Sequence, residues 1–510
     1  MKLIHFLNRY EKHLSVLAVL VCMWPVFQNR QFIGMDVAAH QHNAVLINEL
    51  LSNSDSPMHE YYAFNPILVP NLTGHVILSF LMLFLSASSA IKVLVMIIGF
   101  FFFFGFRKLI HQLQPGAEKF SWIVFPLLWN TFIHYGFFNF ALSIPFALYA
   151  FYYLNQCNKS FSNYKLFCLA LYLGGIWFSH VATFFITCVI ALFIQLNYLM
   201  EEKRTFKTLF IHHAKLLIAF LPFLWLTFKY FSSLPSTQYL YIDKKTITEM
   251  YFQGSSLFSL GLFELNYVYS FFAVLAAMFV IGFSYLLIQR KLNLRLTLIG
   301  TGILLTTIGL TYYLPDADGR GGYMTLRMML FTFVVLCVIA TLLMRNLIVL
   351  RALFSVTTLV IATNWAILKQ EKINELDAYA RDIEAFENDV EKYATVFVFD
   401  AADSWLIHHF SNHLGKHKPM VIYENYECQM SYFPLVWKKK HFVEMNVDVT
   451  TGRKKLLEGF DTYNELLPKY VLIFGELKER RADVKKMNPN LDSIYFLKRE
   501  NNFAELYEKR

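Results

Sequence analysis

The first candidate for chemistry is a carboxylate directly after the first apolar segment. Asp36 stands in the run RQFIGMDVAAHQHN (residues 30–43), and the apolar segment before it ends near residue 28. The following residues favour an amphipathic helix over about 37–51, and the i, i+4 spacing places Asp36 and His40 on one helical face. A carboxylate here could act as a general base that takes a proton from an attacking hydroxyl or amine.

Spacing alone leaves two other interpretations of Asp36 open. Together with His40, it could hold a divalent cation that neutralises a leaving phosphate. It could also be only the N-cap of the following helix, because Asp is favoured at that position. The sequence does not choose among a base, a metal ligand and a helix cap.

A glycine-rich loop, PDADGRGGYMTLR (residues 315–327), is the second informative segment. Arg320 and Arg327 could bind a phosphate, since the guanidinium fork matches two phosphate oxygens. Arg327 is the stronger candidate, because it enters an apolar segment where charges are costly and usually functional. The alternative is that it extends to the membrane interface or pairs with Asp316 or Asp318.

Histidines supply weaker signals. His180 begins an apolar segment and could contact an acceptor or a phosphate, but a lone histidine, like His75, more often packs than binds. His409, His413 and His417 follow i, i+4 spacing, which would place three imidazoles on one helical face and could bind a transition metal. No Cys or carboxylate stands nearby at ligand spacing, so a solvated helix face is the favoured interpretation.

Composition rules out a single water-soluble globule. The 510 residues are 56% hydrophobic, 17% aromatic and only 16% charged, against roughly 25% charged in an ordinary soluble domain. The mean hydropathy is +0.41. The six cysteines are scattered without metal-ligand spacing, so they support neither a disulfide framework nor a zinc site.

The apolar runs predict a polytopic α-helical membrane protein with about eleven transmembrane helices. The first run resembles a signal peptide but has no small-residue cleavage site, so we interpret it as an anchor. We expect spans at about 14–28, 89–106, 120–135, 137–155, 165–178, 180–199, 212–231, 266–288, 296–313, 325–344 and 350–368.

One further apolar run, 71–87, decides the topology. If it spans the membrane, most of the Lys- and Arg-rich loops lie outside. If it is an interfacial helix, they lie in the cytoplasm, as basic loops usually do. We therefore expect 71–87 at the outer interface and the N-terminus in the cytoplasm. The first outer loop, 29–70, and residues 370–510 are then extracytoplasmic.

The composition predicts that residues 370–510 form a separate soluble domain, which follows a membrane domain over residues 1–369. Strand-like runs at 395–400, 420–424, 470–476 and 493–500 are separated by helical patterns such as 404–414, which predicts a small α/β fold. No glycine-rich phosphate loop follows the first strand. The formal charge of +9 arises before residue 370, which indicates an orientation signal and not a nucleic-acid surface.

An outer loop with Asp36 shortly after the first span resembles the GT-C glycosyltransferases. The D-x-x-x-H pattern at Asp36–His40 is similar to a variant in some bacterial members, and residues 61–84 resemble the juxtamembrane helices of the family. The segments 136–145, His180 and the span headed by Arg327 fit the same pattern. The resemblance covers about residues 1–345.

The resemblance implies a glycosyltransferase that uses a polyprenyl-phosphate-linked sugar donor at the outer face, in a bacterial inner membrane. Asp36 would then be the catalytic carboxylate, and the acceptor would be a glycan, lipid or protein. The family often has a second acidic residue in the next outer loop, but the turn HYGFFN (residues 134–139) has none. His134 and Asn139 could replace it, or could be polar helix ends at the headgroups. A divalent cation is a candidate cofactor, and no other is indicated.

A polytopic protein without catalysis, such as a transporter or an assembly scaffold, is the alternative. A transporter should carry charges at mid-membrane depth and helices broken by Gly or Pro in matched halves. In this sequence the polar candidates lie at the predicted outer rim instead, which favours an enzyme site facing the interface. Nucleic acid is not expected as a partner, because the C-terminal domain lacks a basic-aromatic surface.

Overall fold

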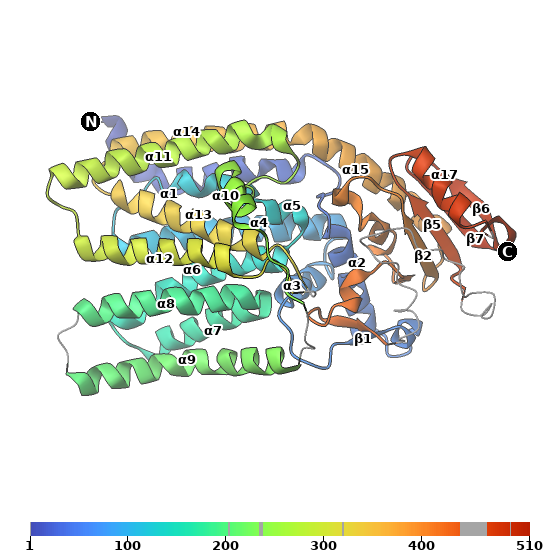
Figure 1. Ribbon diagram of the computed structural model, residues 1–510, viewed down its shortest axis with the longest axis horizontal. Coiled ribbons are helices and arrows are strands. Elements are labelled where there is room, and N and C mark those ends of the chain that lie inside the picture. The colour runs from blue at the N-terminus through green and yellow to red at the C-terminus, as the bar shows by residue number, and fades with distance from the viewer. Residues whose placement is uncertain (1, 202–204, 234–237, 319–320, 439–466, 490) are drawn as a thin grey trace. The chain divides into compact units, whose positions relative to one another are not determined.

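The computed structural model describes residues 2–201, 205–233, 238–318, 321–438, 467–489 and 491–510 (Figure 1). The chain forms two compact units. The first contains residues 1–26 and 95–370, and the second contains residues 27–94 and 371–510. We call them the membrane unit and the mixed unit.

The membrane unit is built from helices, most of them long and apolar. Figure 1 shows α7, α8 and α9 running nearly side by side. Its elements are α1 (Lys2–Met23), η1 (Trp24–Phe27), α4 (Ala87–Leu113), η3 (Trp122–Trp129), α5 (Thr131–Tyr135), α6 (Phe138–Lys159), α7 (Asn163–Ser179), α8 (Val181–Glu201), α9 (Phe206–Ser233), α10 (Lys244–Gln253), η4 (Leu262–Glu264), α11 (Leu265–Ile288), α12 (Leu294–Tyr313), α13 (Met324–Leu343) and α14 (Ile348–Leu368). The first residues of α4 belong to the mixed unit.

Within the described ranges, eight helical segments are long and apolar enough to cross a membrane, by length and composition. They are Arg9–Phe27, Ala87–Leu113, Val181–Met200, Lys207–Ser233, Leu262–Ile288, Leu294–Tyr313, Met324–Leu343 and Ile348–Asp389. The expected spans at 137–155 and 165–178 form α6 and α7, which are outside this set. α7 has 17 residues, and α6 ends in the polar run NQCNK. The expected count of eleven spans therefore stays a prediction.

The expected span at 120–135 is not one continuous helix. Residues Trp122–Trp129 form a 3-10 helix with Pro126 inside it, and a separate helix follows at Thr131–Tyr135. Proline lacks the amide hydrogen that an α-helix needs. Asn130 starts the second helix by accepting a hydrogen bond from the amide of Phe132 at 2.9 Å.

A buried ion pair connects two helices of the membrane unit. Arg107 of α4 donates from Nη2 to Oε2 of Glu11 in α1 at 2.8 Å, and its Nη1 contacts the other carboxylate oxygen. The hydroxyl of Ser15 and the amide of Phe120 also donate to Glu11 Oε1, at 2.9 and 3.0 Å. Because the carboxylate is surrounded by donors, its charge is accommodated in an apolar environment.

The mixed unit contains a five-stranded sheet in the order β3-β2-β5-β7-β6. β2 pairs in parallel with β3 and β5, and β7 pairs antiparallel with β5 and β6. The elements are α2 (Val37–Ser52), η2 (Pro57–Glu60), β1 (Tyr62–Phe64), α3 (Thr73–Leu81), α15 (Gln370–Glu384), η5 (Glu387–Asp389), β2 (Thr395–Asp400), η6 (Trp405–Ile407), η7 (Phe410–Gly415), β3 (Val421–Ile422), η8 (Tyr426–Gln429), β4 (Leu435–Trp437), β5 (Tyr470–Phe474), α17 (Lys478–Met487), α18 (Leu491–Ile494), β6 (Tyr495–Glu500) and β7 (Ala504–Lys509).

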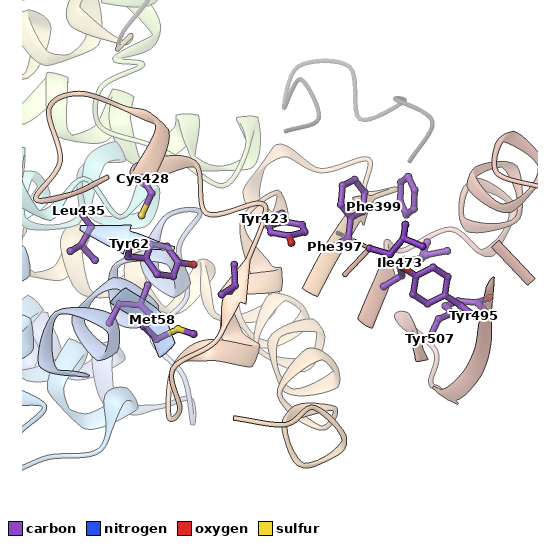
Figure 2. Close-up of a cluster of buried hydrophobic side chains, with 14 of the residues drawn as sticks. Met58, Tyr62, Phe397, Phe399, Tyr423, Cys428, Leu435, Ile473, Tyr495 and Tyr507 are labelled. Carbon is purple, nitrogen blue, oxygen red and sulfur yellow. The ribbon is translucent and has the colours of Figure 1, made fainter. Parts of the chain in front are cut away.

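Residues 27–94 pack with the C-terminal part of the chain, whereas the sequence analysis assigned them to the membrane domain 1–369. β1 pairs antiparallel with β4, Tyr62 opposite Trp437. Figure 2 shows Met58 and Tyr62 beside Cys428 and Leu435 in a buried cluster that continues to the sheet. The physical reason for the difference is that these aromatic and aliphatic side chains find their apolar partners in the C-terminal segment.

Of two local expectations in the mixed unit, one agrees with the structure and one differs from it. The run 71–87, expected as an interfacial helix and not as a span, forms the nine-residue α3 before a turn. Nine residues extend about 14 Å, which is less than a bilayer core of about 30 Å. The segment 404–414, expected as a helix, forms the short 3-10 helices η6 and η7. The i, i+4 face expected for His409, His413 and His417 therefore does not form.

Candidate active site

Asp36 is buried where the chain enters α2, and its side chain does not cap that helix. It occupies the N-cap position with φ −92° and ψ −1°, yet its carboxylate makes no capping hydrogen bond to the described backbone. Asp36 is 3% exposed. Its Oδ1 lies 3.7 Å from Nε2 of His409, and the hydroxyl of Tyr426 hydrogen-bonds to the carboxylate. Helix capping therefore does not explain this side chain.

The ionisation of Asp36 results from opposing effects. Burial raises its pKa, whereas the His409 and His40 rings and the Tyr426 hydroxyl lower it, which leaves the pKa at about 6. Burial lowers the pKa of His409, but the carboxylates of Glu424 and Asp36 raise it by more, so that the pKa lies at about 9. At neutral pH an ionised carboxylate therefore faces an imidazolium. A carboxylate whose pKa lies near the working pH is well suited to general base catalysis.

The ring of His409 is held in place by a second carboxylate. Its Nδ1 contacts Oε1 of Glu424, and the other oxygen of Glu424 accepts from Ser411 at 2.6 Å and from Asn412 at 2.7 Å. The ring stacks on Tyr426 with centroids 4.2 Å apart. These contacts orient His409 with Nε2 toward Asp36.

A second buried cluster begins one helical turn after Asp36. His40 Nδ1 lies 3.0 Å from His75 Nε2 and 2.9 Å from Oε1 of Glu427. His75 Nε2 lies 2.8 Å from Oε2 of Glu427. The three side chains come from α2, α3 and η8, and they are 4%, 1% and 1% exposed, respectively. The His40 and His75 rings meet edge to face.

Polar neighbours fix the orientation of this cluster. Nδ1 of His75 lies 3.1 Å from the carbonyl oxygen of Asn71. The amide nitrogen of Asn43 donates to Oε2 of Glu427 at 2.5 Å, and Asn425 donates to Oδ1 of Asn43 at 2.8 Å. Although burial raises the pKa of Glu427, the His40 and His75 rings hold it well below its usual range. Glu427 is therefore an ionised, buried carboxylate.

Close packing of α2 on η7 brings the two clusters together. The His42 ring bridges from α2 to Asn412, at 3.0 Å, and to the carbonyl oxygen of Met420, at 3.1 Å. A methyl group at Gly415 would overlap the His42 ring. Glycine at this position therefore allows the close approach that places η7 and η8 beside Asp36 and His40.

Two groups of side chains among the described residues have a composition and spacing that could hold a metal ion. The first is the His40, His75 and Glu427 cluster. The second is Glu384, Glu387 and His417, which is only partly buried. In the second group His417 already pairs with Glu387 at 2.8 Å, and Glu384 pairs with Lys416 at 3.1 Å.

The expected phosphate-binding residue, Arg327, lies in the membrane unit. Its guanidinium carbon is 6.0, 5.1 and 5.6 Å from the ring centroids of Phe132, Phe137 and Phe140, respectively. Such cation–π contacts stabilise a guanidinium in an aromatic environment. His180 packs edge to face on Phe140 and lies within electrostatic range of Arg327. The structure thus brings Arg327 and His180 together around one ring.

The remaining predicted site residues fall into three cases. His134 is buried and stacks on Trp129 with centroids 5.6 Å apart. Asn139 is buried in the first turn of α6. Arg320 lies outside the described residues. In the mixed unit, the predicted pair Asp36 and His40 is brought together.

Sequence reasoning missed most of the partners of Asp36 and His40. His75 was interpreted as a packing residue, and His409 as part of a solvated helix face. Glu424 and Glu427 were not singled out, and Tyr426 was overlooked with them. The available signal was the run YENYEC (residues 423–428), in which two acidic residues directly follow an apolar strand.

Among the described residues, eight helical segments apolar enough to cross a membrane and a small α/β sheet define the fold. Two solved structures with this fold are those of ArnT from Cupriavidus metallidurans. The apo structure superposes with a TM-score of 0.58 at 8% identity and covers 98% of each chain. The structure bound to undecaprenyl phosphate has a TM-score of 0.55 at 9% identity and covers 97% of this chain and 96% of that chain.

The similarity to ArnT extends over nearly the whole chain, including the C-terminal domain. It confirms the expected fold class, polytopic and α-helical with a small C-terminal α/β domain, and the fold-level resemblance to GT-C glycosyltransferases. No family model matches the sequence, and no curated protein matches it.

Proposed function

We propose that this protein is a membrane glycosyltransferase that moves a sugar from a polyprenyl-phosphate-linked donor to an acceptor at the outer face of the membrane. The observation that carries the proposal is the buried carboxylate of Asp36. It stands directly after the first span of an ArnT-like fold, with a pKa of about 6. Its Oδ1 makes no hydrogen bond among the described residues and has only the ion-pair contact to His409 at 3.7 Å, so its lone pairs are free to accept a proton.

In the proposed reaction, Asp36 is the general base. Its carboxylate removes the proton from an acceptor hydroxyl or amine as the acceptor heteroatom attacks the anomeric carbon of the donor sugar. The new glycosidic bond forms while the bond between the anomeric carbon and the phosphate oxygen breaks. Polyprenyl phosphate leaves with the bonding electrons, and the proton remains on Asp36. His409, as an imidazolium, keeps Asp36 ionised before the reaction.

The donor phosphate is assigned to Arg327, with His180 beside it. A guanidinium can bind two phosphate oxygens, and the three phenylalanine rings around Arg327 suit the apolar tail of a lipid. One of the ArnT structures contains undecaprenyl phosphate, which supports a lipid phosphate as the ligand class. His134 and Asn139 are proposed as further polar contacts to donor or acceptor.

The test is a comparison of Asp36→Asn with Asp55→Asn in a strain that lacks the gene. Asp55 is an exposed aspartate of the same unit, so it controls for the loss of a carboxylate. Mass spectrometry of membrane lipids measures polyprenyl-phosphate sugars. We expect the donor to accumulate in the deletion strain and with Asp36→Asn, and to be consumed with the wild-type gene and Asp55→Asn.

Full consumption of the donor with Asp36→Asn, at normal protein level, would overturn the assignment of Asp36. If no polyprenyl-phosphate sugar accumulates in the deletion strain, the glycosyltransferase proposal fails. The protein is then better described as a transporter or scaffold without catalysis. The same lipid spectrum identifies the sugar when the proposal holds.

The orientation is proposed from the distribution of basic residues. The N-terminus then lies in the cytoplasm, and the first outer loop and residues 370–510 lie outside, in a bacterial inner membrane. A phosphatase reporter that is active only outside the cytoplasm, fused after residue 510, should be active. An inactive C-terminal phosphatase together with an active cytoplasmic reporter would reverse the orientation.

A further inference from the structure

We propose that Tyr426 is a positioning residue that holds both the Asp36 carboxylate and its charged partner, His409. This role rests on the proposed function, in which Asp36 is the general base, and it names the group that orients that base. Tyr426 is the first residue of η8 and follows shortly after β3. Its ring and its hydroxyl make two different contacts in the candidate active site.

The ring of Tyr426 lies nearly flat against His409. The two ring centroids are 4.2 Å apart, and the ring planes differ by 23°. Phe433 meets Tyr426 edge to face, with centroids 6.1 Å apart. A cation over an aromatic face is attracted by the ring quadrupole, so an imidazolium at His409 favours this stack. The ring of Tyr426 is therefore fixed between two neighbours, and it limits the rotation of His409.

The hydroxyl of Tyr426 contacts the base itself. It hydrogen-bonds to the Asp36 carboxylate, and the phenol is the donor, because an ionised carboxylate can only accept. Burial and the charge of Asp36 raise the pKa of Tyr426 well above its usual value, so the hydroxyl keeps its proton during the reaction. Tyr426 therefore acts through Asp36 and does not itself exchange a proton with the substrate.

The other contacts of Asp36 do not fix the rotation of its carboxylate. The side chain makes no capping hydrogen bond to the described backbone, and Oδ1 makes no hydrogen bond among the described residues. His409 Nε2 lies 3.7 Å from Oδ1, a charge contact without the directionality of a hydrogen bond. The phenol supplies that directionality and leaves Oδ1 open to the proton of the acceptor. A base held in one orientation reacts faster than one that rotates.

The groups that face Asp36 determine what loss of the hydroxyl would do. They are His40 on α2, His409 just before η7, and Tyr426 and Glu427 on η8. Burial and Glu427 raise the pKa of Asp36, whereas the two histidines lower it. The Tyr426 hydroxyl also lowers it, because its hydrogen bond stabilises the ionised form. Without the hydroxyl, Asp36 should therefore protonate at a higher pH.

The kinetic experiment uses Tyr426→Phe, which removes one oxygen and keeps the ring. Full-length protein is assayed in nanodiscs, with the donor lipid that accumulates in the deletion strain and with membranes of that strain as acceptor. We expect kcat to fall about tenfold, with KM for the donor within about twofold of the wild type. Tyr423→Phe is the matched control, because Tyr423 is buried in the same segment and its hydroxyl bonds to Thr395. It should keep the wild-type kcat.

A second measurement follows the Asp36 carboxylate without a transfer assay. An infrared titration of protein carrying 13C-labelled aspartate, with Asp36→Asn as the blank, gives its midpoint. We expect a midpoint near pH 6 in the wild type and one about one unit higher in Tyr426→Phe. An unchanged midpoint in Tyr426→Phe, or a kcat equal to that of the active wild type, would overturn the positioning role. A shifted midpoint in a protein whose wild type transfers no sugar would instead overturn the proposed function, while the contact between Tyr426 and Asp36 stands.

Discussion

Replacing His409 by glutamine should move the acid limb of the pH–rate profile to higher pH. Asp36 must be ionised to accept a proton, so activity should fall as the pH drops through its pKa of about 6. The imidazolium of His409 favours the ionised form of Asp36. Glutamine keeps a hydrogen-bonding amide but removes the positive charge, and Asp36 then protonates at a higher pH.

The distance between the two groups sets the size of the effect. Opposite unit charges 3.7 Å apart attract by about 4–5 kcal/mol at an effective dielectric constant of roughly 20. This corresponds to about three pKa units, and it is an upper bound because Glu424 already compensates part of the charge on His409. We expect a shift of about one to two units, from an acid-limb midpoint near pH 6 to one between about pH 7 and 8.

The assay is the initial rate of sugar transfer between pH 5 and 9 for protein in lipid nanodiscs. His408→Gln is the matched control, because His408 is the adjacent histidine and pairs with Asp400 instead. Its acid limb should stay within about half a unit of the wild type. A limb for His409→Gln that stays in place, or that moves to lower pH, would refute the electrostatic reasoning.

Three further predictions concern packing and charge. Gly415→Ala should lower both the unfolding midpoint and the activity, because the methyl group of the new alanine would overlap the His42 ring. Unchanged thermal unfolding would contradict this prediction. Arg327→Lys should raise KM for the lipid donor about tenfold or more with a smaller change in kcat, because lysine cannot bind two phosphate oxygens at once. A KM equal to that of the wild type in donor titrations would show that Arg327 does not bind the phosphate. Arg107→Met should destabilise the protein by about 3–5 kcal/mol, because it leaves the Glu11 carboxylate buried without its partner. Adding Glu11→Leu should restore most of the thermal stability, and a double variant no more stable than the single one would contradict this.

Local features of the sequence were sufficient to predict α2 and the shared helical face of Asp36 and His40. The helix was expected over about 37–51 and forms at Val37–Ser52. The i, i+4 relation of Asp36 and His40 requires only helical geometry. The apolar run at 395–400 likewise became β2. By contrast, β1 and β4 have three residues each, which is too short for an alternating pattern to be detected.

The partners of Asp36 could not be predicted, because they are distant along the chain. His409 lies more than 370 residues after Asp36, and the local pattern of neither segment predicts the contact between them. The predicted α-helix at 404–414 was wrong, because apolar residues at helical spacing fit two short 3-10 helices as well as one α-helix. His75 was undervalued because a lone histidine in an apolar run becomes informative only when a carboxylate is found opposite it.

The arrangement along α2 explains why residues 27–94 and the C-terminal segment pack as one unit. Asp36, His40 and Asn43 follow i, i+4, i+7 spacing, so they share one face of the helix. An isolated helix would expose this polar face to water, yet all three residues are buried. Each has a charged partner in the segment 409–427, and His40 also contacts His75. A buried carboxylate is tolerated only with compensating charge or donors, so Asp36 acquires its environment only when that segment is packed on α2. The C-terminal domain therefore supplies part of the candidate active site, and variants at its buried polar residues should affect activity as strongly as variants in the loop.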